Sequence, residues 1–245
     1  MDKADARASR ARSVDPEELA HFEELGENWW DLSGPMRALH ALNPVRVSYV
    51  RDCVAKHGTF EGARILDIGC GGGILCEPLA RMGAEMTGID PAPGNIDIAR
   101  AHAAPQSLAV NYRTDTAETL VAEGASFDAV LAMEVIEHVP NQAAFVATAA
   151  ALVRPGGLLI MSTLNRTLKS FALAIIGAEY VLRWLPKGTH KWERFVTPEE
   201  LARFMRRSEM RVIDRAGIVY NPLSGKWGLS RDTDVNYVIV AEKGL

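Results

Sequence analysis

The chain has 245 residues, of which 48% are hydrophobic and 24% charged, and its formal net charge is −4. This length and apolar content allow one large domain or two small ones with a sizeable core, and they exclude global disorder. The acidic balance argues against wholesale nucleic-acid binding, which usually needs a basic face. The cysteines are odd in number and lack a zinc-binding spacing, which indicates free thiols in a reducing compartment.

The N-terminal sequence MDKADARASRARSVDPEE mixes arginine with acidic residues and contains no apolar run. A secretory signal needs such a run, and a transit peptide is poor in acids, so we interpret residues 1–20 as a disordered, solvated tail. We expect residues 21–245 to form a single domain that begins with an N-terminal cap over residues 21–60.

Short apolar runs alternate with helix-like segments from about residue 60 onward. The runs typical of strands are residues 64–69, 84–90, 108–113, 127–134 and 156–163. Such alternation predicts crossover units, and hence an α/β fold whose parallel sheet has helices on both faces. Thr197 and Pro198 then predict a helix start, because threonine caps and proline fits the first turn. Residues 210–220 and 235–243 predict a hairpin that closes one sheet edge.

A glycine-rich turn, Asp67-Ile68-Gly69-Cys70-Gly71-Gly72-Gly73, follows the first predicted strand directly. Glycines let the backbone approach a ligand closely, and the helix expected from Ile74 presents its amide groups. We therefore predict a nucleotide-like cofactor at the carboxyl ends of the strands. A dinucleotide fingerprint requires glycine or alanine three residues after its second glycine. Ile74 and Cys76 stand there in the two possible registers, which weakens the interpretation as a hydride-transfer enzyme.

The turn instead resembles the D-x-G-x-G-x-G signature of S-adenosylmethionine-dependent methyltransferases with the Rossmann-like fold. Asp90 ends the second predicted strand, where this superfamily uses an acid to hold both ribose hydroxyls; a carboxylate accepts hydrogen bonds from a vicinal diol. The alternative role of Asp90 is to cap the helix that follows Pro91. Met133 ends the fourth predicted strand, where the superfamily lines the cofactor's methionine and the transferring methyl group.

Three residues whose side chains can bind a metal ion or transfer a proton follow Met133 at positions i, i+3 and i+4: Glu134, Glu137 and His138. One helical turn would point all three to one side. Two carboxylates and an imidazole form either a divalent-metal site or an acid–base site. The alternative is that the glutamates are solvated loop residues and that the histidine packs below the cofactor. A catechol-like substrate favours the metal, because adjacent oxygens chelate Mg²⁺, which lowers the hydroxyl pKa.

An apolar stretch, LKSFALAIIGAEYVLRWLPK, covers residues 168–187. A membrane span needs about 20 predominantly apolar residues, and this stretch falls short. Glu179, Arg183 and Lys187 are four apart and predict one polar stripe on an amphipathic helix, which docks on the core or lies in a lipid interface. Cations outnumber acids over residues 166–194, and anionic headgroups attract such cations by about 1 kcal/mol each. We therefore expect a helical insertion over about residues 164–196 that contacts an anionic membrane.

Segments along most of the chain resemble the ubiquinone biosynthesis O-methyltransferase family. They are WWDLSGPMRALHALNPVR (29–46), DIGCGGGILCEPLARMGAEMTGID (67–90), AMEVIEHVP (132–140), STLNRTLKS (162–170), GAEYVLRWLPKGTHKWERFVTPEEL (177–201) and DVNYVIV (234–240). The resemblance implies a class I methyltransferase with a mostly parallel seven-stranded sheet and an antiparallel C-terminal hairpin. Its implied acceptors are 3-polyprenylbenzene-1,2-diol and 3-demethylubiquinol. It further implies a cytoplasmic enzyme at the inner face of the membrane, other quinone-biosynthesis enzymes as partners, and no nucleic acid.

The resemblance also assigns roles to residues of this chain. Arg46 corresponds to the family's N-terminal arginine that reaches the cofactor, and a forked guanidinium suits a carboxylate. The other matching cofactor positions are Asp67, Gly69, Gly71, Asp90 and Met133. Eukaryotic relatives are regarded as magnesium-dependent through an E-x-x-E-H cluster, which matches Glu134, Glu137 and His138. If no metal binds, His138 is the leading general base. Trp29 and Trp30 are expected to be lid or core aromatics that cover the cofactor.

Two other functions stay open at this point. The first is methylation of another acceptor, including RNA 2′-hydroxyls, since some small-RNA methyltransferases carry a similar cluster. The second is a cofactor-binding scaffold without turnover within a membrane-associated complex. The acidic pI of about 5.9 and the apolar insertion disfavour RNA, and the retained acids and histidine disfavour an inert scaffold.

Overall fold

The structure is a computed structural model that describes residue 14, residues 29–171 and residues 192–245. Its helices are α3 (Arg37–His57), α4 (Cys76–Arg81), α5 (Pro93–Ala103), α6 (Ala117–Ala122), α7 (Gln142–Ala151), α8 (Leu168–Ser170) and α9 (Pro198–Arg207). Its 3₁₀ turns are η2 (Ala104–Gln106), η3 (Ile136–His138) and η5 (Trp192–Arg194). Its strands are β1 (Arg64–Ile68), β2 (Glu85–Asp90), β3 (Val110–Thr114), β4 (Phe127–Met133), β5 (Val153–Leu164), β6 (Met210–Asn221), β7 (Lys226–Ser230) and β8 (Asn236–Lys243).

One mixed sheet runs through the described residues, with the strand order β3-β2-β1-β4-β5-β8-β6-β7. Strands β1 to β5 pair in parallel, whereas β8 is antiparallel to β5 and β6, and β7 is antiparallel to β6. Each predicted strand run corresponds to an observed strand. The expected α/β fold, with a mostly parallel sheet and antiparallel C-terminal strands, is confirmed.

The described part of the sheet has eight strands, one more than the seven expected. The additional strand is β7, whose residues are half-buried or exposed, so no buried apolar run marks it in the sequence. It forms by pairing with β6 across a turn in which Gly225 takes a φ of +66°. The predicted pairing of β6 with β8 is observed. However, β7 rather than this pair ends the sheet.

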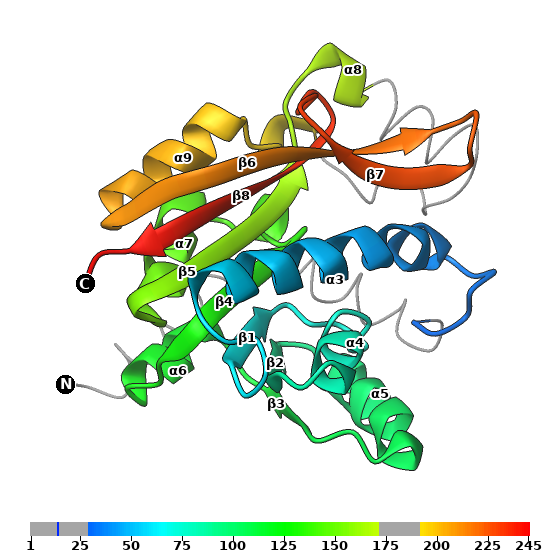
Figure 1. Cartoon of the computed structure of the whole chain (residues 1–245), viewed down its shortest axis with the longest axis vertical. Helices are drawn as coiled ribbons and strands as arrows, with labels where there is room; N and C mark the ends of the chain where they lie inside the picture. The colour runs from blue at the N-terminus through cyan, green and yellow to red at the C-terminus, as the bar shows by residue number, and fades with distance from the viewer. Residues whose placement is uncertain (1–13, 15–28, 172–191) are drawn as a thin grey trace.

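Helices cover both faces of the sheet, as Figure 1 shows. Alternate residues of a strand point to opposite faces, and β1 illustrates this: Ile65 belongs to the buried cluster beneath α3, α4 and α5, whereas Leu66 belongs to the cluster beneath α6, α7 and α9. Burying one such side chain contributes about 1.5–3 kcal/mol. The two apolar faces therefore hold the strand ends in a fixed arrangement.

The helix predicted from Thr197 is also observed. Pro198 is the first residue of α9, and Thr197 and Glu200 form a reciprocal capping box, with the Glu200 amide 3.2 Å from Thr197 Oγ1 and the Thr197 amide 2.9 Å from Glu200 Oε2. Such a cap stabilises a helix by about 1 kcal/mol.

The functional edge of the sheet follows from the strand order. The chain leaves β1 toward β2 and returns to β4 on the other side of β1, so the order reverses between β1 and β4. In open α/β sheets, ligands bind outside the carboxyl ends of the strands at such a reversal. The antiparallel strand β8 begins at the same edge, because Asn236 pairs with Leu164 at the end of β5.

The predicted helical insertion is described only at its ends. Residues 172–191, which include Glu179, Arg183 and Lys187, lie outside the described residues, as do residues 1–13 and 15–28 of the N-terminal segment. Among the helices that the structure describes, none combines the length and the apolar content that crossing a membrane requires.

Candidate active site

The glycine-rich turn after β1 requires glycine both for backbone shape and for space. Gly69, Gly71 and Gly73 have φ values of +71°, +53° and +86°, in the left-handed region that side chains disfavour. A Cβ atom on Gly71 would lie 2.3 Å from Cη2 of Trp29, and one on Gly73 would lie 2.2 Å from the Tyr112 hydroxyl. The turn extends through residue 75, so α4 begins two residues after the expected start at Ile74.

Asp90 joins the turn to the start of α5. Its carboxylate accepts hydrogen bonds from the Gly71 amide (3.0 Å), the Ala92 amide (2.9 Å) and Asn95 Nδ2 (3.2 Å). Burial raises the pKa of Asp90, and these hydrogen bonds oppose the shift. The bond from Ala92 belongs to the capping alternative, whereas the bond from Gly71 holds the carboxylate against the turn.

Asp67 lies at the base of the turn, buried within β1. Its Oδ2 atom accepts a hydrogen bond from Cys76 Sγ at 3.3 Å, which connects the strand with the first residue of α4. Burial raises the pKa of this carboxyl to about 7, while the hydrogen bond from the thiol and the charge of Arg46 act in the opposite direction.

A second group of polar side chains converges on Glu134. Arg46 of α3 is 7% exposed, and its Nη2 atom donates to Glu134 Oε1 at 2.8 Å. Ser162 Oγ donates to the same oxygen at 2.9 Å and Asn236 Nδ2 at 3.0 Å. One carboxylate oxygen therefore connects α3, the end of β4, β5 and the start of β8.

The backbone at Glu134 is strained. Glu134 follows Met133, the half-buried last residue of β4, and has a φ of +59°. A residue other than glycine in this conformation costs about 1–3 kcal/mol, and such strain often occurs at functional sites. The Glu134 amide donates to the Ser162 carbonyl at 3.0 Å, which helps to hold this conformation.

Glu137 is 3% exposed and lies in η3. Its Oε2 atom accepts a hydrogen bond from Thr163 Oγ1 at 2.9 Å, whereas its buried Oε1 atom has no hydrogen-bond partner among the described residues. Burial, and then the nearby Glu134 charge, hold the pKa of Glu137 well above its usual range. His138 follows in the same turn and is half-buried.

The predicted three-residue metal cluster is not formed. Among the residues that the structure describes, no group of three or more His, Cys, Asp and Glu side chains is arranged to hold a metal ion. The physical reason is the local backbone: η3 begins after Glu134, which is left-handed, and a 3₁₀ turn has about three residues per turn. Glu134 and Glu137 lie close enough for the charge of Glu134 to raise the pKa of Glu137, and His138 is the last residue of η3.

Several polar residues of this region were not identified from the sequence: Asn95, Ser162, Thr163, Asn165 and Asn236. For the four residues other than Asn95, which lies in α5, the available signal was a polar residue in or next to the end of an otherwise apolar strand, and motif spacing does not detect this. In the described part of the chain, the buried atoms without a hydrogen-bond partner include Arg46 Nε, Glu137 Oε1, Asn165 Oδ1 and Asn236 Oδ1. Each such atom costs about 1–3 kcal/mol, and several of them near one strand edge indicate a ligand-binding region.

Two cations of the predicted basic patch form ion pairs within the chain. Arg166 pairs with Glu200, and Lys169 Nζ lies 2.5 Å from Asp232 and 3.2 Å from Asp234. Surface pairs of this kind, half-buried for Arg166 and Glu200 and exposed for Lys169, contribute only about 0–1 kcal/mol. They nevertheless compensate part of the positive charge that the sequence predicted for this surface.

Comparison with known proteins agrees with this geometry. A family model described as a methyltransferase domain matches residues 45–214. The structure of magnesium protoporphyrin IX methyltransferase from Synechocystis PCC 6803, solved with bound SAH, has the same fold with a TM-score of 0.67 and 19% identity, covering 99% of this chain and 100% of that one. The fold and the glycine turn thus define a class I S-adenosylmethionine-dependent methyltransferase.

Relatives that align with nearly the whole length of this chain identify its family within the methyltransferase class. The ubiquinone biosynthesis O-methyltransferase of Methylocella silvestris is 55% identical and aligns with 94% of this chain and 95% of its own length. Those of Methylobacterium nodulans and Azorhizobium caulinodans are 56% and 52% identical, aligning with 94% and 96% of this chain and 96% of their own lengths. The chain belongs to the ubiquinone biosynthesis O-methyltransferase family.

Proposed function

We propose that this O-methyltransferase acts in ubiquinone biosynthesis. Its acceptors are ring hydroxyls of 3-polyprenylbenzene-1,2-diol and of 3-demethylubiquinol. The observation that carries the proposal is the identity above 50% with the relatives of that name, which extends over nearly the whole chain. The buried polar group around Glu134 supports it, because a ring with two adjacent hydroxyls needs several hydrogen-bonding partners at the end of β4.

The cofactor side of the proposal rests on the glycine turn and on Arg46. The turn with Gly69 and Gly71 lies at the carboxyl end of β1, where S-adenosylmethionine binds, and Asp90 accepts hydrogen bonds from the ribose hydroxyls, since an ionised carboxylate has room for more than three donors. Arg46 directs its unpartnered Nε–H toward the methionine carboxylate while Glu134 holds its Nη2 atom. Met133 lines the path of the methyl group, and Asp67 supports the turn from below.

The acceptor side of the proposal concerns orientation and proton removal. When bound, S-adenosylmethionine supplies a methyl group on a positively charged sulfur, so the chain's main task is to hold the ring oxygen in line with it. Asn236 Oδ1 and Glu137 Oε1, both buried and without partners in the described chain, accept hydrogen bonds from the ring hydroxyls. His138 removes the proton, either directly or through one water.

The described site offers Mg²⁺ a pair of carboxylate ligands rather than the predicted set of three. Mg²⁺ keeps several waters and is usually held by one or two carboxylates together with substrate oxygens. Glu134 and Glu137 would hold it through the unpartnered Glu137 Oε1, and binding would have to displace the proton that the raised pKa of Glu137 favours. When bound, the ion supplies Lewis acidity that lowers the pKa of a ring hydroxyl. Activity that survives thorough chelation and does not rise with added Mg²⁺ would exclude this part of the proposal.

The apolar polyprenyl chain of the acceptor leads to a proposal about where the enzyme binds, namely at the membrane surface. Residues 166–194 contact an anionic membrane surface, as the amphipathic sequence pattern suggests, and bring the enzyme to its polyprenylated substrate. The test is co-sedimentation with liposomes that contain anionic lipid, using a variant with Arg183→Glu and Lys187→Glu. Lys169 stays unchanged, because it pairs with Asp232 and Asp234. Binding that depends neither on anionic lipid nor on these charges would contradict the proposal.

The decisive experiment is a methyl-transfer assay with labelled S-adenosylmethionine. The acceptors are a short-chain demethylubiquinol, a short-chain polyprenyl catechol and a small RNA. We expect label in both ring compounds and none in the RNA. Label in the RNA alone would identify a different acceptor, and cofactor binding without transfer to any acceptor would indicate a scaffold.

A further inference from the structure

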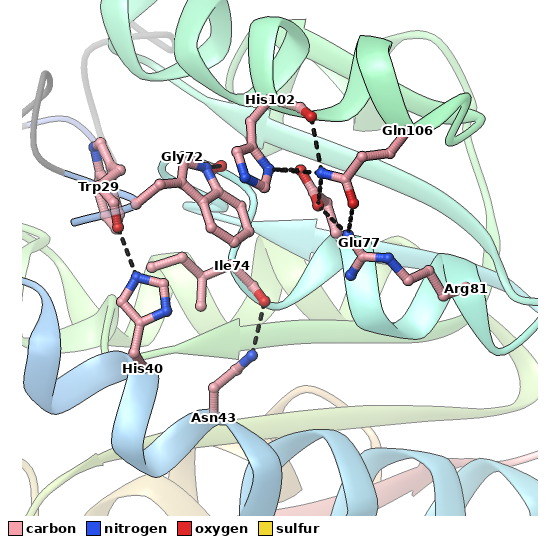
Figure 2. Close-up of polar contacts among 10 residues, drawn as sticks. Trp29, His40, Asn43, Gly72, Ile74, Glu77, Arg81, His102 and Gln106 are labelled. Atoms are coloured by element: carbon pink, nitrogen blue, oxygen red, sulfur yellow. Dashed lines mark hydrogen bonds and ion pairs between the residues drawn. The ribbon is translucent and has the colours of Figure 1, made fainter. Parts of the chain in front are cut away.

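A cluster of polar and aromatic side chains contacts the glycine turn; it includes Trp29 and Trp30, which the sequence predicts as lid or core aromatics, and none of the predicted catalytic, cofactor-binding or metal residues. Figure 2 shows that it connects three segments: the residues before α3, the turn with α4, and the end of α5. Its centre is Glu77 of α4, which is 0% exposed although it is a carboxylate. A charged residue this deeply buried requires partners, because an unpaired buried charge is strongly destabilising.

Glu77 has these partners on both of its oxygens. His102 Nδ1 of α5 donates to Oε1 at 2.6 Å, while Arg81 Nη2 and Gln106 Nε2 donate to Oε2 at 2.7 Å and 3.3 Å. Gln106 also donates to the His102 carbonyl at 2.9 Å. The imidazole of His102 is therefore held in one orientation by α4.

The oriented imidazole supports Trp30. The two rings stack with their centroids 3.5 Å apart and an interplanar angle of 8°. The indole of Trp30 also contacts the turn, because its Nε1 atom donates a hydrogen bond to the Gly72 carbonyl at 2.9 Å. Trp30 thus links a residue of α5 to the backbone of the turn.

Three neighbouring contacts strengthen the same connection. The Trp29 ring lies against the turn, since a Cβ atom on Gly72 would be 2.6 Å from Trp29 Cγ. Asn43 Nδ2 donates to the Ile74 carbonyl at 2.7 Å, and His40 Nε2 donates to the Trp29 carbonyl at 2.8 Å. Two carbonyl groups of the turn, those of Gly72 and Ile74, are therefore held by side chains from the N-terminal side of the molecule.

This arrangement matters because the turn has few side chains of its own with which to hold its shape. Glycines lose more conformational freedom on folding than other residues, so a left-handed glycine segment needs contacts from outside. We propose that Glu77, His102 and Trp30 form a turn clamp, a set of positioning residues that fixes the glycine turn for S-adenosylmethionine. This inference rests on the proposed placement of the cofactor at the turn. A simple packing role would stabilise the fold without changing cofactor affinity in particular.

The test compares variants that remove one link of the turn clamp at a time. Trp30→Ala removes the stack and the bond to Gly72, Trp30→Phe keeps the stack, and His102→Phe keeps a ring but loses the bond to Glu77. The control is His57→Ala, because His57 is an exposed histidine that is bonded to the Cys53 carbonyl and lines a pocket with Asp128, away from the strand ends that carry the site. The readouts are the Kd of S-adenosylhomocysteine by calorimetry and the separate KM values of cofactor and acceptor.

We expect Trp30→Ala to raise the Kd by about tenfold, because a stacked pair and one hydrogen bond are lost together. Trp30→Phe and His102→Phe are each expected to raise it by about threefold. The acceptor KM should change by less than about twofold, and His57→Ala should match the wild type. If Trp30→Ala does not fold, the two phenylalanine variants still provide the test.

Unchanged Kd values in folded variants would reduce the cluster to packing, and an equal rise in the acceptor KM would contradict a role specific to the cofactor. These failures differ from failure of the proposed function. A wild-type protein that does not bind S-adenosylhomocysteine would refute the cofactor placement, and with it the turn clamp. Wild-type binding without methyl transfer to a quinol or catechol would refute only the acceptor.

Discussion

In the cofactor half of the site, the glycine turn after β1 and the end of β2 are close in the chain, whereas the proposed acceptor half, around β4, β5 and β8, joins distant segments. Asp90 holds the Gly71 amide across 19 positions, but Glu134 meets Arg46 across 88 positions and Asn236 across 102. A local turn has few alternative arrangements, while a distant contact depends on the whole sheet. The two halves should therefore respond differently to substitution, with the cofactor half behaving as one local unit.

The largest expected effect is on the pH dependence of stability and comes from Asp67, the buried residue of β1 beneath the glycine turn. Burial raises the pKa of Asp67 from 3.8 to about 7 in the folded chain, so between about pH 4 and pH 7 the folded state binds more protons than the unfolded state. The contribution of Asp67 to the free energy of unfolding is therefore most favourable below about pH 4. It falls as the pH rises to about 7, by roughly 4 kcal/mol in total, at about 1.4 kcal/mol per pH unit. Asp67→Asn should lack this fall.

Urea unfolding of both proteins at several pH values in this window measures the difference. The asparagine keeps an oxygen that accepts the bond from Cys76. Parallel stability curves for the two proteins would show that Asp67 does not titrate in this window, and would remove one distinction between the halves.

The next effect tests whether the glycine turn tolerates any side chain. Gly71→Ala places a methyl group 2.3 Å from the Trp29 ring at a φ of +53°, so the turn must shift. We expect the Kd of S-adenosylhomocysteine to rise by about 100-fold, equivalent to about 2.7 kcal/mol. The matched control is Gly94→Ala in α5, where the added Cβ meets no described heavy atom within 4 Å. Calorimetry on both variants would contradict the expectation if their affinities were equal.

A pair of asparagine substitutions compares the two halves directly. Asn95 joins Trp29 to Asp90 in the cofactor half, and Asn236 bonds to Glu134 in the proposed acceptor half. Asn95→Leu should raise the cofactor KM and Asn236→Leu the acceptor KM, each by about tenfold, because a buried polar link worth about 1.4 kcal/mol is lost. Steady-state kinetics with each substrate varied in turn measures both values. A reversed or shared pattern would mean that the halves are not separate.

The smallest effect lies outside both halves. Thr197→Ala removes the capping box of α9 and should lower the free energy of unfolding by about 1 kcal/mol. Neither KM should change, since α9 packs against the face of the sheet opposite to α3, α4 and α5. Thermal unfolding and kinetics on the same preparation measure both properties, and a shift in either KM would show that the site depends on overall stability.

The difference between the halves also explains what could be predicted from the sequence. The turn from Asp67 to Gly73 and the acid at Asp90 follow from local backbone requirements, so the cofactor was predictable. The helical turn that would align Glu134, Glu137 and His138 is not formed, because Glu134 is left-handed and only Ile136–His138 forms a 3₁₀ turn. Ser162 and Asn236 could not be related to Glu134, nor Thr163 to Glu137, without knowledge of the strand register.

The sequence by itself determined the α/β alternation, the cofactor class, the helix cap at Thr197 and the family, since each depends on patterns within a few dozen residues. Only the tertiary structure decided that Arg46 is buried against Glu134, that Asn236 joins them, and that Trp30 stacks on His102 above a buried Glu77. The physical reason is that strand order and helix packing bring these side chains together, and contacts between residues 25 to 102 positions apart leave no periodic trace in the sequence.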